Sequence, residues 1–158
     1  MHAPEQPADP DFVARVKMSF ARQGFMALLG ARITRVEPGM VEIEAPFRAD
    51  LTQQHGYFHA GVTSAIADTA GGYSGYTLFP ADSSVLTVEF KINLLAPAQG
   101  NRLCATGRVV KSGRTLTVCA LEVHALSGEG DEGDGAMKRT LCASGQQTLI
   151  CLHGVADG

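Results

Sequence analysis

The run from His59 to Tyr76, HAGVTSAIADTAGGYSGY, constrains the fold more than any other part of the chain. It consists almost wholly of small and hydroxyl residues and contains no proline, so we expect a helix from about Ala60 to Leu78. Small residues recur along one side of that helix at Ala60, Ser64, Ala67, Gly71 and Ser74. Such a face lets neighbouring strands come close to the helix backbone. We therefore expect a helix enclosed by a curved sheet.

Strand patterns precede and follow this helix. Before it, Ile33, Val41, Ile43 and Ala45 alternate with charged residues around a Glu37-Pro38-Gly39 turn, which is typical of a hairpin. After it come four candidate strands, at Ser84–Leu95, Arg102–Lys111, Arg114–Leu126 and Lys138–Ile150. In the first of these, Leu86, Val88, Phe90, Ile92 and Leu94 share a face that we expect in the core, with Thr87 on the other face. This order predicts an α+β domain with a mostly antiparallel sheet covering one long helix.

The N-terminal part of the chain predicts a tail followed by a short helix. Asp9-Pro10 suggests an N-cap and a first helical residue, and the apolar residues that follow recur at i, i+4 and i+8 until about Gln23-Gly24. A second helical turn is expected over Phe25–Leu29. We expect a disordered tail at residues 1–8, a single domain at 9–150 and a second tail at 151–158.

Composition excludes several classes of protein. The chain has 158 residues, 45% hydrophobic and 18% charged, which suits one globular domain. Its net charge of −3, without a block of basic residues, gives no basis for nucleic-acid binding. No apolar run reaches the roughly 20 residues of a membrane span, and the N-terminus lacks a secretory signal, so we expect a cytoplasmic protein.

The four cysteines, Cys104, Cys119, Cys142 and Cys151, form no CxxC pair. They fall mostly in the expected strands, which favours buried free thiols over a zinc site. His55 and His59 are spaced like a metal-binding pair, but Gly56 and the lack of a third ligand argue against one. We expect no metal. The acidic loop from Ser127 to Ala136 contains GxGxxG spacing without a βαβ unit, and its acids do not follow the EF-hand order.

Asp68 is the single charged residue of the opening run and has apolar neighbours. Burying its charge is unfavourable unless hydrogen bonds or an ion partner compensate. Two interpretations stay open from these residues. The carboxylate is either held by a hydroxyl or turned to solvent, or it is a general base or nucleophile in a cleft poor in water.

The start of the same helix is a second candidate. Free N–H groups of Ala60, Gly61 and Val62 would lie at the positive end of the helix dipole, where an oxyanion is stabilised. Ala60 and Asp68 are eight residues apart, about 12 Å along the axis at ~1.5 Å per residue, too far to act on one carbonyl. A two-fold axis that sets two such helices antiparallel would bring the helix start of one chain to the aspartate of the other. We therefore expect a site shared by two subunits.

Three stretches together are similar to a known family: residues 53–61 (QQHGYFHAG), residues 67–69 (ADT) and residues 87–98 (TVEFKINLLAPA). They resemble the hotdog-fold acyl-CoA thioesterases, particularly the phenylacetic-acid-degradation (PaaI-like) type, from about Phe25 to Thr148. The most specific part is the triplet His-Ala-Gly with an acid nine residues after the histidine. The family usually has His-Gly-Gly there, and an asparagine where Gln53 stands.

The resemblance implies an acyl-CoA hydrolase that forms a homodimer or a dimer of dimers and needs no cofactor beyond the CoA of its substrate. It assigns Asp68 as general base or nucleophile and the Ala60 N–H as the group that polarises the thioester carbonyl. By the same resemblance, Gln53 positions water or the thioester, and the Thr87 hydroxyl faces the catalytic water. Gly61, next to Ala60, is a candidate substrate contact.

Further candidates concern substrate binding. Tyr57, Phe58 and Tyr73 could line an acyl pocket for aromatic or medium-chain acids. For the CoA end the family suggests the turn containing Lys111, Gly113, Arg114 and Thr115, although a solvated hairpin tip explains these residues as well. His59 could act as a base, but we expect a histidine before a helix to fix the loop by a hydrogen bond.

Two other functions are kept as alternatives. One is a hotdog enoyl-thioester hydratase or dehydratase, and the other is a domain that binds acyl-CoA without turnover. The sequence leaves open the acyl group, the pathway and the choice between base and nucleophile for Asp68.

Overall fold

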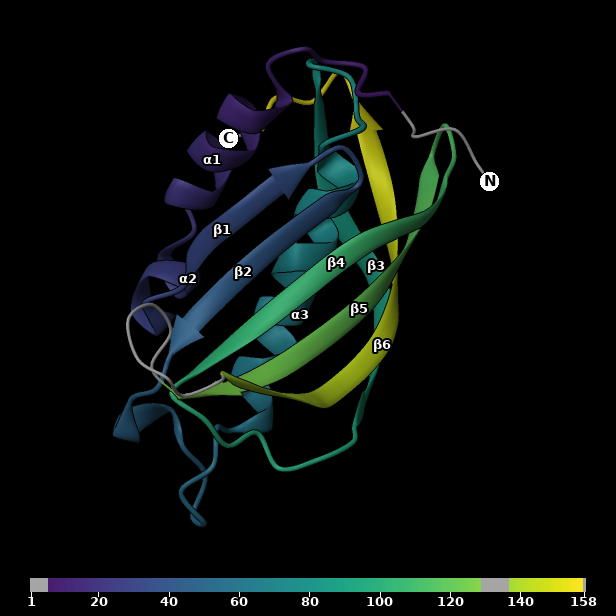
Figure 1. Cartoon of the computed structure of the whole chain (residues 1–158). Coiled ribbons are helices and arrows are strands. Elements are labelled where there is room, and N and C mark those ends of the chain that lie inside the picture. The colour runs from purple at the N-terminus through teal and green to yellow at the C-terminus, as the bar shows by residue number, and fades with distance from the viewer. Residues whose placement is uncertain (1–5, 129–136, 158) are drawn as a thin grey trace.

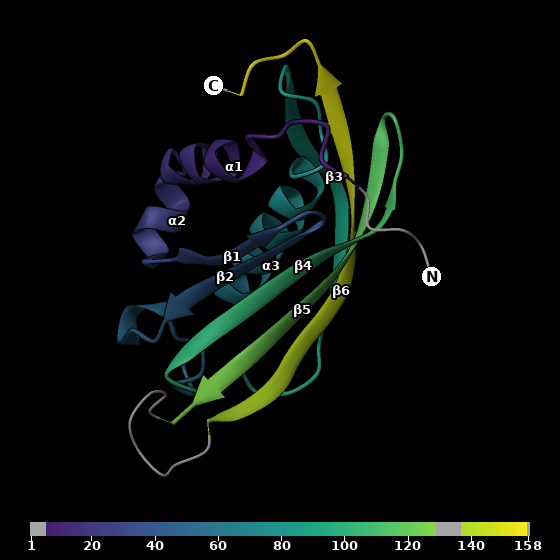
Figure 2. The ribbon, with the colours of Figure 1, turned by 45° about the horizontal axis from the view of Figure 1, so that its top comes forward.

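The computed structural model describes residues 6–128 and 137–157. Its described part contains a six-stranded sheet with the strand order β1-β2-β4-β5-β6-β3, in which every pairing is antiparallel. Figures 1 and 2 show the sheet curving around the long helix α3. The predicted class, an α+β hotdog fold with a central helix and an antiparallel sheet, is confirmed.

The predicted elements occur with small changes at their ends. The helices are α1 (Phe12–Ala21), α2 (Gly24–Leu29) and α3 (Ala60–Tyr76), with a short 3-10 turn at Ala49–Leu51. The strands are β1 (Arg32–Glu37), β2 (Met40–Pro46), β3 (Ser83–Leu94), β4 (Arg102–Ser112), β5 (Leu116–Ser127) and β6 (Lys138–His153). Gly39, in the turn between β1 and β2, has a φ of 72°, the left-handed conformation that favours glycine.

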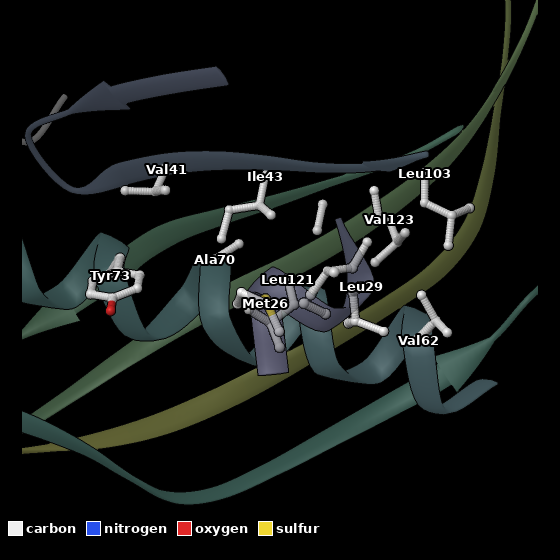
Figure 3. Close-up of a cluster of buried hydrophobic side chains, with 14 of the residues drawn as sticks. Met26, Leu29, Val41, Ile43, Val62, Ala70, Tyr73, Leu103, Leu121 and Val123 are labelled. Atoms are coloured by element: carbon white, nitrogen blue, oxygen red, sulfur yellow. The ribbon is translucent and has the colours of Figure 1, made fainter. Parts of the chain in front are cut away.

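The core lies between α3 and the concave face of the sheet. Figure 3 shows buried side chains there, including Met26, Leu29, Val41, Ile43, Val62, Ala70, Leu103, Leu121 and Val123. The close approach expected from the small residues is present. A Cβ on Gly71 of α3 would lie 2.5 Å from Leu121, and one on Gly107 of β4 would lie 2.5 Å from the Ala70 backbone. Glycines on both elements therefore let α3 rest directly on the sheet.

The prediction of which β3 residues face the core is wrong for the first half of the strand. Leu86 and Val88 are 57% and 56% exposed in the single chain. The register against β6 shifts between Thr87 and Glu89, so one residue is inserted there as a bulge. Directly paired residues share a face, and Thr87 pairs with the buried Leu149. The bulge therefore places Thr87 on the inner side, together with the later residues Phe90, Ile92 and Leu94.

The first helix starts later than the Asp9-Pro10 pattern predicts. The Asp9 side chain accepts a hydrogen bond from the Asp11 N–H at 2.9 Å, which forms a turn ahead of α1. Asp9 also pairs with Arg15 at 3.1 Å. Arg15 in turn donates to the Tyr76 and Phe79 carbonyl oxygens and stacks over the Tyr76 ring. Asp9 therefore helps to join α1 to the end of α3.

The last strand continues past the expected domain boundary at residue 150. It ends at His153, and Cys151 lies in the core at 4% exposure. Gly154 then donates its N–H to the Asp82 carbonyl oxygen, and Asp157 pairs with Arg22 at 2.7 Å. The chain from 151 to 157 therefore packs on the domain instead of forming a disordered tail. Most of the expected N-terminal tail, residues 1–5, lies outside the described residues, as do residues 129–136 of the acidic loop.

All four cysteines are buried and none forms a disulfide, as predicted. They lie on β4, β5 and β6. Within the described residues, no helix combines the length and apolar character needed to cross a membrane.

Candidate active site

Asp68 lies at the middle of α3 and lines a cavity of about 770 Å³. The side chain is half-buried. The cavity is bounded by α3, by β3 and by the helices α1 and α2. Its wall is mixed. Apolar and aromatic side chains come from Phe25, Met26, Tyr73, Val85, Leu86 and Phe90, and the charged side chains of Arg22 and Asp157 also line it.

The Asp68 carboxylate is held through one of its two oxygens. Thr87 donates its hydroxyl to Oδ1 at 2.7 Å, and Gln147 donates Nε2–H to the same oxygen at 2.5 Å. The same amide nitrogen lies 2.9 Å from the Thr87 hydroxyl oxygen and 3.1 Å from the Asp68 carbonyl oxygen. Both open interpretations of Asp68 are thus partly met, since the carboxylate is held by a hydroxyl and also lines a cavity.

Gln147 is the residue of this cluster that the sequence predictions missed. It is 1% exposed and comes from β6, 79 residues after Asp68. A signal was present in the strand pattern, because Ala143, Leu149 and Cys151 share its two-residue periodicity and are buried. A glutamine in such a series is a buried polar group that needs partners.

The start of α3 has fewer free amides than expected. His59 is the N-cap, and its Nδ1 accepts the Gly61 N–H at 2.8 Å. The Val62 N–H donates to the His59 carbonyl oxygen at 3.0 Å. Of the three amides considered, only that of Ala60 makes no hydrogen bond with a described residue. Of the three amides, the Ala60 N–H is therefore the one left to bind a ligand, and His59 has the loop-fixing contact that we expected.

Ala60 lines a second cavity, of about 490 Å³, together with Gln53, Tyr57 and Phe58. Gln53 is fixed by the turn that precedes the helix, where its side-chain oxygen accepts the His55 N–H and its backbone bonds to Tyr57 and Gly56. Phe58 is buried and packs edge-to-face on Phe47 at a centroid distance of 5.4 Å. The Gln53 amide nitrogen makes no hydrogen bond with a described residue, so a donor is left at this cavity.

The predicted site residues thus fall into two groups. Asp68, Thr87, Gly61 and Tyr73 line the first cavity, and Ala60, Gln53, Tyr57 and Phe58 line the second. A single chain does not place the carboxylate and the Ala60 amide in one cavity. This separation agrees with the distance estimated from the helix rise.

The turn proposed for CoA belongs to neither cavity in the single chain. Lys111, Gly113, Arg114 and Thr115 are all exposed at the tip between β4 and β5. Thr115 and Arg114 use their carbonyl oxygens to bond to Cys151 and His153 of β6. The charged side chains of the turn are left to solvent.

Tyr73 closes the inner wall of the Asp68 cavity. Its hydroxyl is 2.9 Å from the Ser19 hydroxyl and accepts a hydrogen bond from Gln23 Nε2 at 3.0 Å. Burial raises the pKa of Tyr73 above its ordinary value, so the hydroxyl stays neutral and available for hydrogen bonding. Among the described residues, no group of three or more His, Cys, Asp or Glu side chains could hold a metal ion. His55 and His59 therefore have no third ligand near them in the described part of the chain.

The antiparallel sheet wrapped around α3 defines a hotdog fold, and comparison with known proteins gives the family. The thioesterase superfamily model matches residues 55–131. The crystal structure of a thioesterase family protein from Silicibacter pomeroyi is 44% identical, with a TM-score of 0.82, and the match covers 90% of this chain and 99% of that one. The chain belongs to the thioesterase superfamily and is a thioester hydrolase. This finding favours hydrolysis over the hydratase and binding alternatives.

Two further relatives extend the comparison. The chain is 25% identical over 100 residues to the 1,4-dihydroxy-2-naphthoyl-CoA hydrolase of Listeria monocytogenes, a match that covers 63% of this chain and 81% of that protein. The structure of the E. coli PaaI protein, from the phenylacetic acid degradation operon, shares the fold with a TM-score of 0.76 at 16% identity, over 94% of this chain and 99% of that one. The expected likeness to the PaaI type is therefore confirmed for the fold.

Proposed function

We propose that this protein hydrolyses acyl-CoA thioesters at a site shared by two copies of the chain. The observation that carries the proposal is the Asp68 carboxylate, held on one oxygen by Thr87 and Gln147 at the wall of a cavity. In this scheme the second oxygen acts on water or on the thioester itself. The Ala60 N–H of the other copy stabilises the oxyanion that develops on the carbonyl.

Two chemical routes fit this arrangement. In the first, Asp68 takes a proton from water while the water oxygen attacks the thioester carbonyl, and collapse of the tetrahedral intermediate expels CoA thiolate. In the second, Asp68 attacks the carbonyl, CoA thiolate leaves, and water hydrolyses the resulting anhydride. A single turnover in labelled water distinguishes the routes, because oxygen label enters the Asp68 side chain only on the second.

The shared site is supported by the separation of the two cavities and by the character of β3. This strand is at an edge of the sheet, and Leu86, Val88 and Phe90 on it are exposed in the single chain. An unpaired strand edge with apolar side chains is a surface that association would cover. Leu86 and Phe90 also line the Asp68 cavity, so a second copy at β3 would reach the carboxylate. We propose a homodimer on this basis, and a dimer of dimers as its further assembly.

The linings of the cavities support an aromatic or medium-chain acyl group. Tyr73 and Phe90 line the Asp68 cavity, and Tyr57 and Phe58 line the Ala60 cavity. Apolar and aromatic side chains of this kind can bury an aryl or alkyl chain. For the CoA end we retain Lys111, Gly113, Arg114 and Thr115 as the candidates. The chemistry uses no cofactor beyond the CoA of the substrate, and buried cysteines without disulfides fit a reducing compartment such as the cytoplasm.

The first test is thiol release from a panel of aliphatic and aromatic acyl-CoAs, with Asp68→Asn as the matched variant. We expect turnover of at least one member of the panel and a loss of about 10³-fold or more in kcat for Asp68→Asn, because an amide neither accepts a proton readily nor attacks a carbonyl. Tight binding of CoA esters without turnover, unchanged by Asp68→Asn, would contradict the proposal.

The second test asks whether two chains share the site. Ala60→Pro removes the N–H at the first helical position, where proline is well tolerated, and His59 already has the extended backbone that a residue before proline adopts. Each of Asp68→Asn and Ala60→Pro alone should be inactive. A mixed dimer holds one intact site of two, so equal mixing after unfolding and refolding should restore about a quarter of the wild-type activity. Absence of any restored turnover would count against a shared site.

A further inference from the structure

We infer that Gln147 is a positioning residue that determines which oxygen of Asp68 reacts, leaving Oδ2 as the reactive atom. The inference rests on the proposed function of Asp68 and adds a residue to it. Gln147 reaches the site from β6 and touches Asp68 and Thr87 with a single nitrogen.

The hydrogen bonds to the Asp68 carboxylate distinguish its two oxygens. A side-chain amide carries two N–H groups, and Nε2 of Gln147 has three acceptors within reach, so its hydrogens are shared among them. Thr87 uses its only hydroxyl hydrogen on Oδ1. Both donors converge on Oδ1, whereas no hydrogen bond from a described residue reaches Oδ2. The oxygen without a donor keeps its lone pairs for water or for a carbonyl carbon.

The orientation of the amide is set by its neighbours. If the Gln147 amide were turned over, its carbonyl oxygen would face the carboxylate oxygen at hydrogen-bonding distance, which is repulsive. In the observed orientation, Oε1 is buried and makes no hydrogen bond with a described residue. A buried acceptor without a partner is unfavourable. The Gln147 amide therefore keeps its N–H donors on Asp68 although its Oε1 makes no hydrogen bond within the described chain.

Gly71 provides the space that this arrangement needs. A Cβ built on Gly71 would lie 1.9 Å from Gln147 Oε1. Because Gly71 is three residues after Asp68 on α3, the helix makes room for the amide beside the carboxylate that the amide holds. Gly71 thus offers a way to displace Gln147 without changing it, although a Cβ there would also push on the Leu121 side chain at 2.5 Å.

The test uses purified full-length protein and the best acyl-CoA of the panel. Gln147→Met keeps the length of the side chain and removes both N–H donors. We expect kcat to fall by about tenfold to 100-fold with KM within about twofold of wild type, since misplacing a reacting group acts on the chemical step. Gly71→Ala should lower kcat in the same way with Gln147 still present. Gln146→Met is the matched control, since Gln146 is the exposed neighbour on the other face of β6 and should leave both constants unchanged.

A double-mutant cycle with Thr87→Val gives a readout that a purely structural role would not produce. Because Thr87 and Gln147 donate to the same oxygen, the loss of kcat in the double variant should be smaller than the product of the single losses. Wild-type kcat in both Gln147→Met and Gly71→Ala, or losses that arise only from KM, would overturn the inference while Asp68→Asn stays inactive. Turnover by Asp68→Asn would instead overturn the proposed function itself.

Discussion

At the scale of single residues, His59 caps α3 with its ring. Nδ1 accepts the Gly61 N–H at 2.8 Å, so in this contact Nε2 carries the ring proton. A lone pair used in this way is not available to take a proton from water. The contact therefore accounts for a histidine before the helix without a role in acid–base catalysis.

The first prediction separates capping from catalysis at His59. His59→Ala should lower the free energy of unfolding by about 0.5–2 kcal/mol, because an N-cap acceptor is lost. His59→Asn keeps a side-chain acceptor at the cap and should recover most of that loss. Urea unfolding measures the stability, and thiol release measures kcat in the same samples. A catalytic base at this position would instead show a collapse of kcat in His59→Asn with stability intact.

The residues of the site differ in how far the sequence predicts them. The resemblance implies that Asp68 and Thr87 act on the same water, and the structure adds a direct hydrogen bond of 2.7 Å from the Thr87 hydroxyl to Asp68 Oδ1. The separation of Ala60 from Asp68 follows from the helix rise alone. Gln147 is different, since its contact depends on the register of β6 against β3 and on the room at Gly71. The two-residue pattern around residue 147 indicates that Gln147 is buried, but it predicts neither this register nor the space at Gly71.

At the scale of elements, the glycines of α3 and β4 differ in how closely their neighbours approach, and only some are needed for the packing of the two elements. Gly107 faces the α3 backbone, where a Cβ would lie 2.5 Å from atoms of Ala70 and Gly71. Gly72, one residue after Gly71, has nothing within 4 Å of the same position. The two positions therefore separate close packing from helix propensity.

The second prediction uses this pair. Gly107→Ala should lower the free energy of unfolding by about 1–3 kcal/mol or more, because two backbones must move apart. Gly72→Ala should raise it by about 0.8–1 kcal/mol, because alanine is the better helix former and meets open space. Chemical denaturation of both variants measures the changes. If both substitutions stabilised the protein, the contact between α3 and β4 would not be as close as described.

The error on β3 shows why a strand face is harder to predict than a strand. The alternation of Leu86, Val88, Phe90, Ile92 and Leu94 is regular, and it correctly predicts a strand over nearly the observed residues. A single bulge near Val88 turns the residues before it to the opposite faces of the sheet. The alternation of apolar residues in the sequence gives no sign of this bulge. Thr87 turns inward as a result, which is what lets it reach Asp68.

At the scale of the whole molecule, the four cysteines are distributed over three neighbouring strands of the sheet. Cys104 lies on β4, Cys119 on β5, and Cys142 and Cys151 on β6, all buried. Burial raises the pKa of Cys104, Cys142 and Cys151 above the ordinary thiol value, which disfavours the reactive thiolate. Exposure of these thiols therefore requires opening of the central sheet.

The third prediction follows from that distribution. In native buffer at pH 7.5, the aromatic disulfide reagent DTNB should label no thiol within minutes, and in concentrated denaturant it should label all four. Since the three strands are consecutive neighbours in the sheet, we expect labelling to rise along one curve of denaturant concentration that coincides with loss of circular dichroism. Measuring the labelled count by mass spectrometry shows whether partial species occur. A species carrying one label on Cys151 at low denaturant would mean that the end of β6 opens separately from the rest of the sheet.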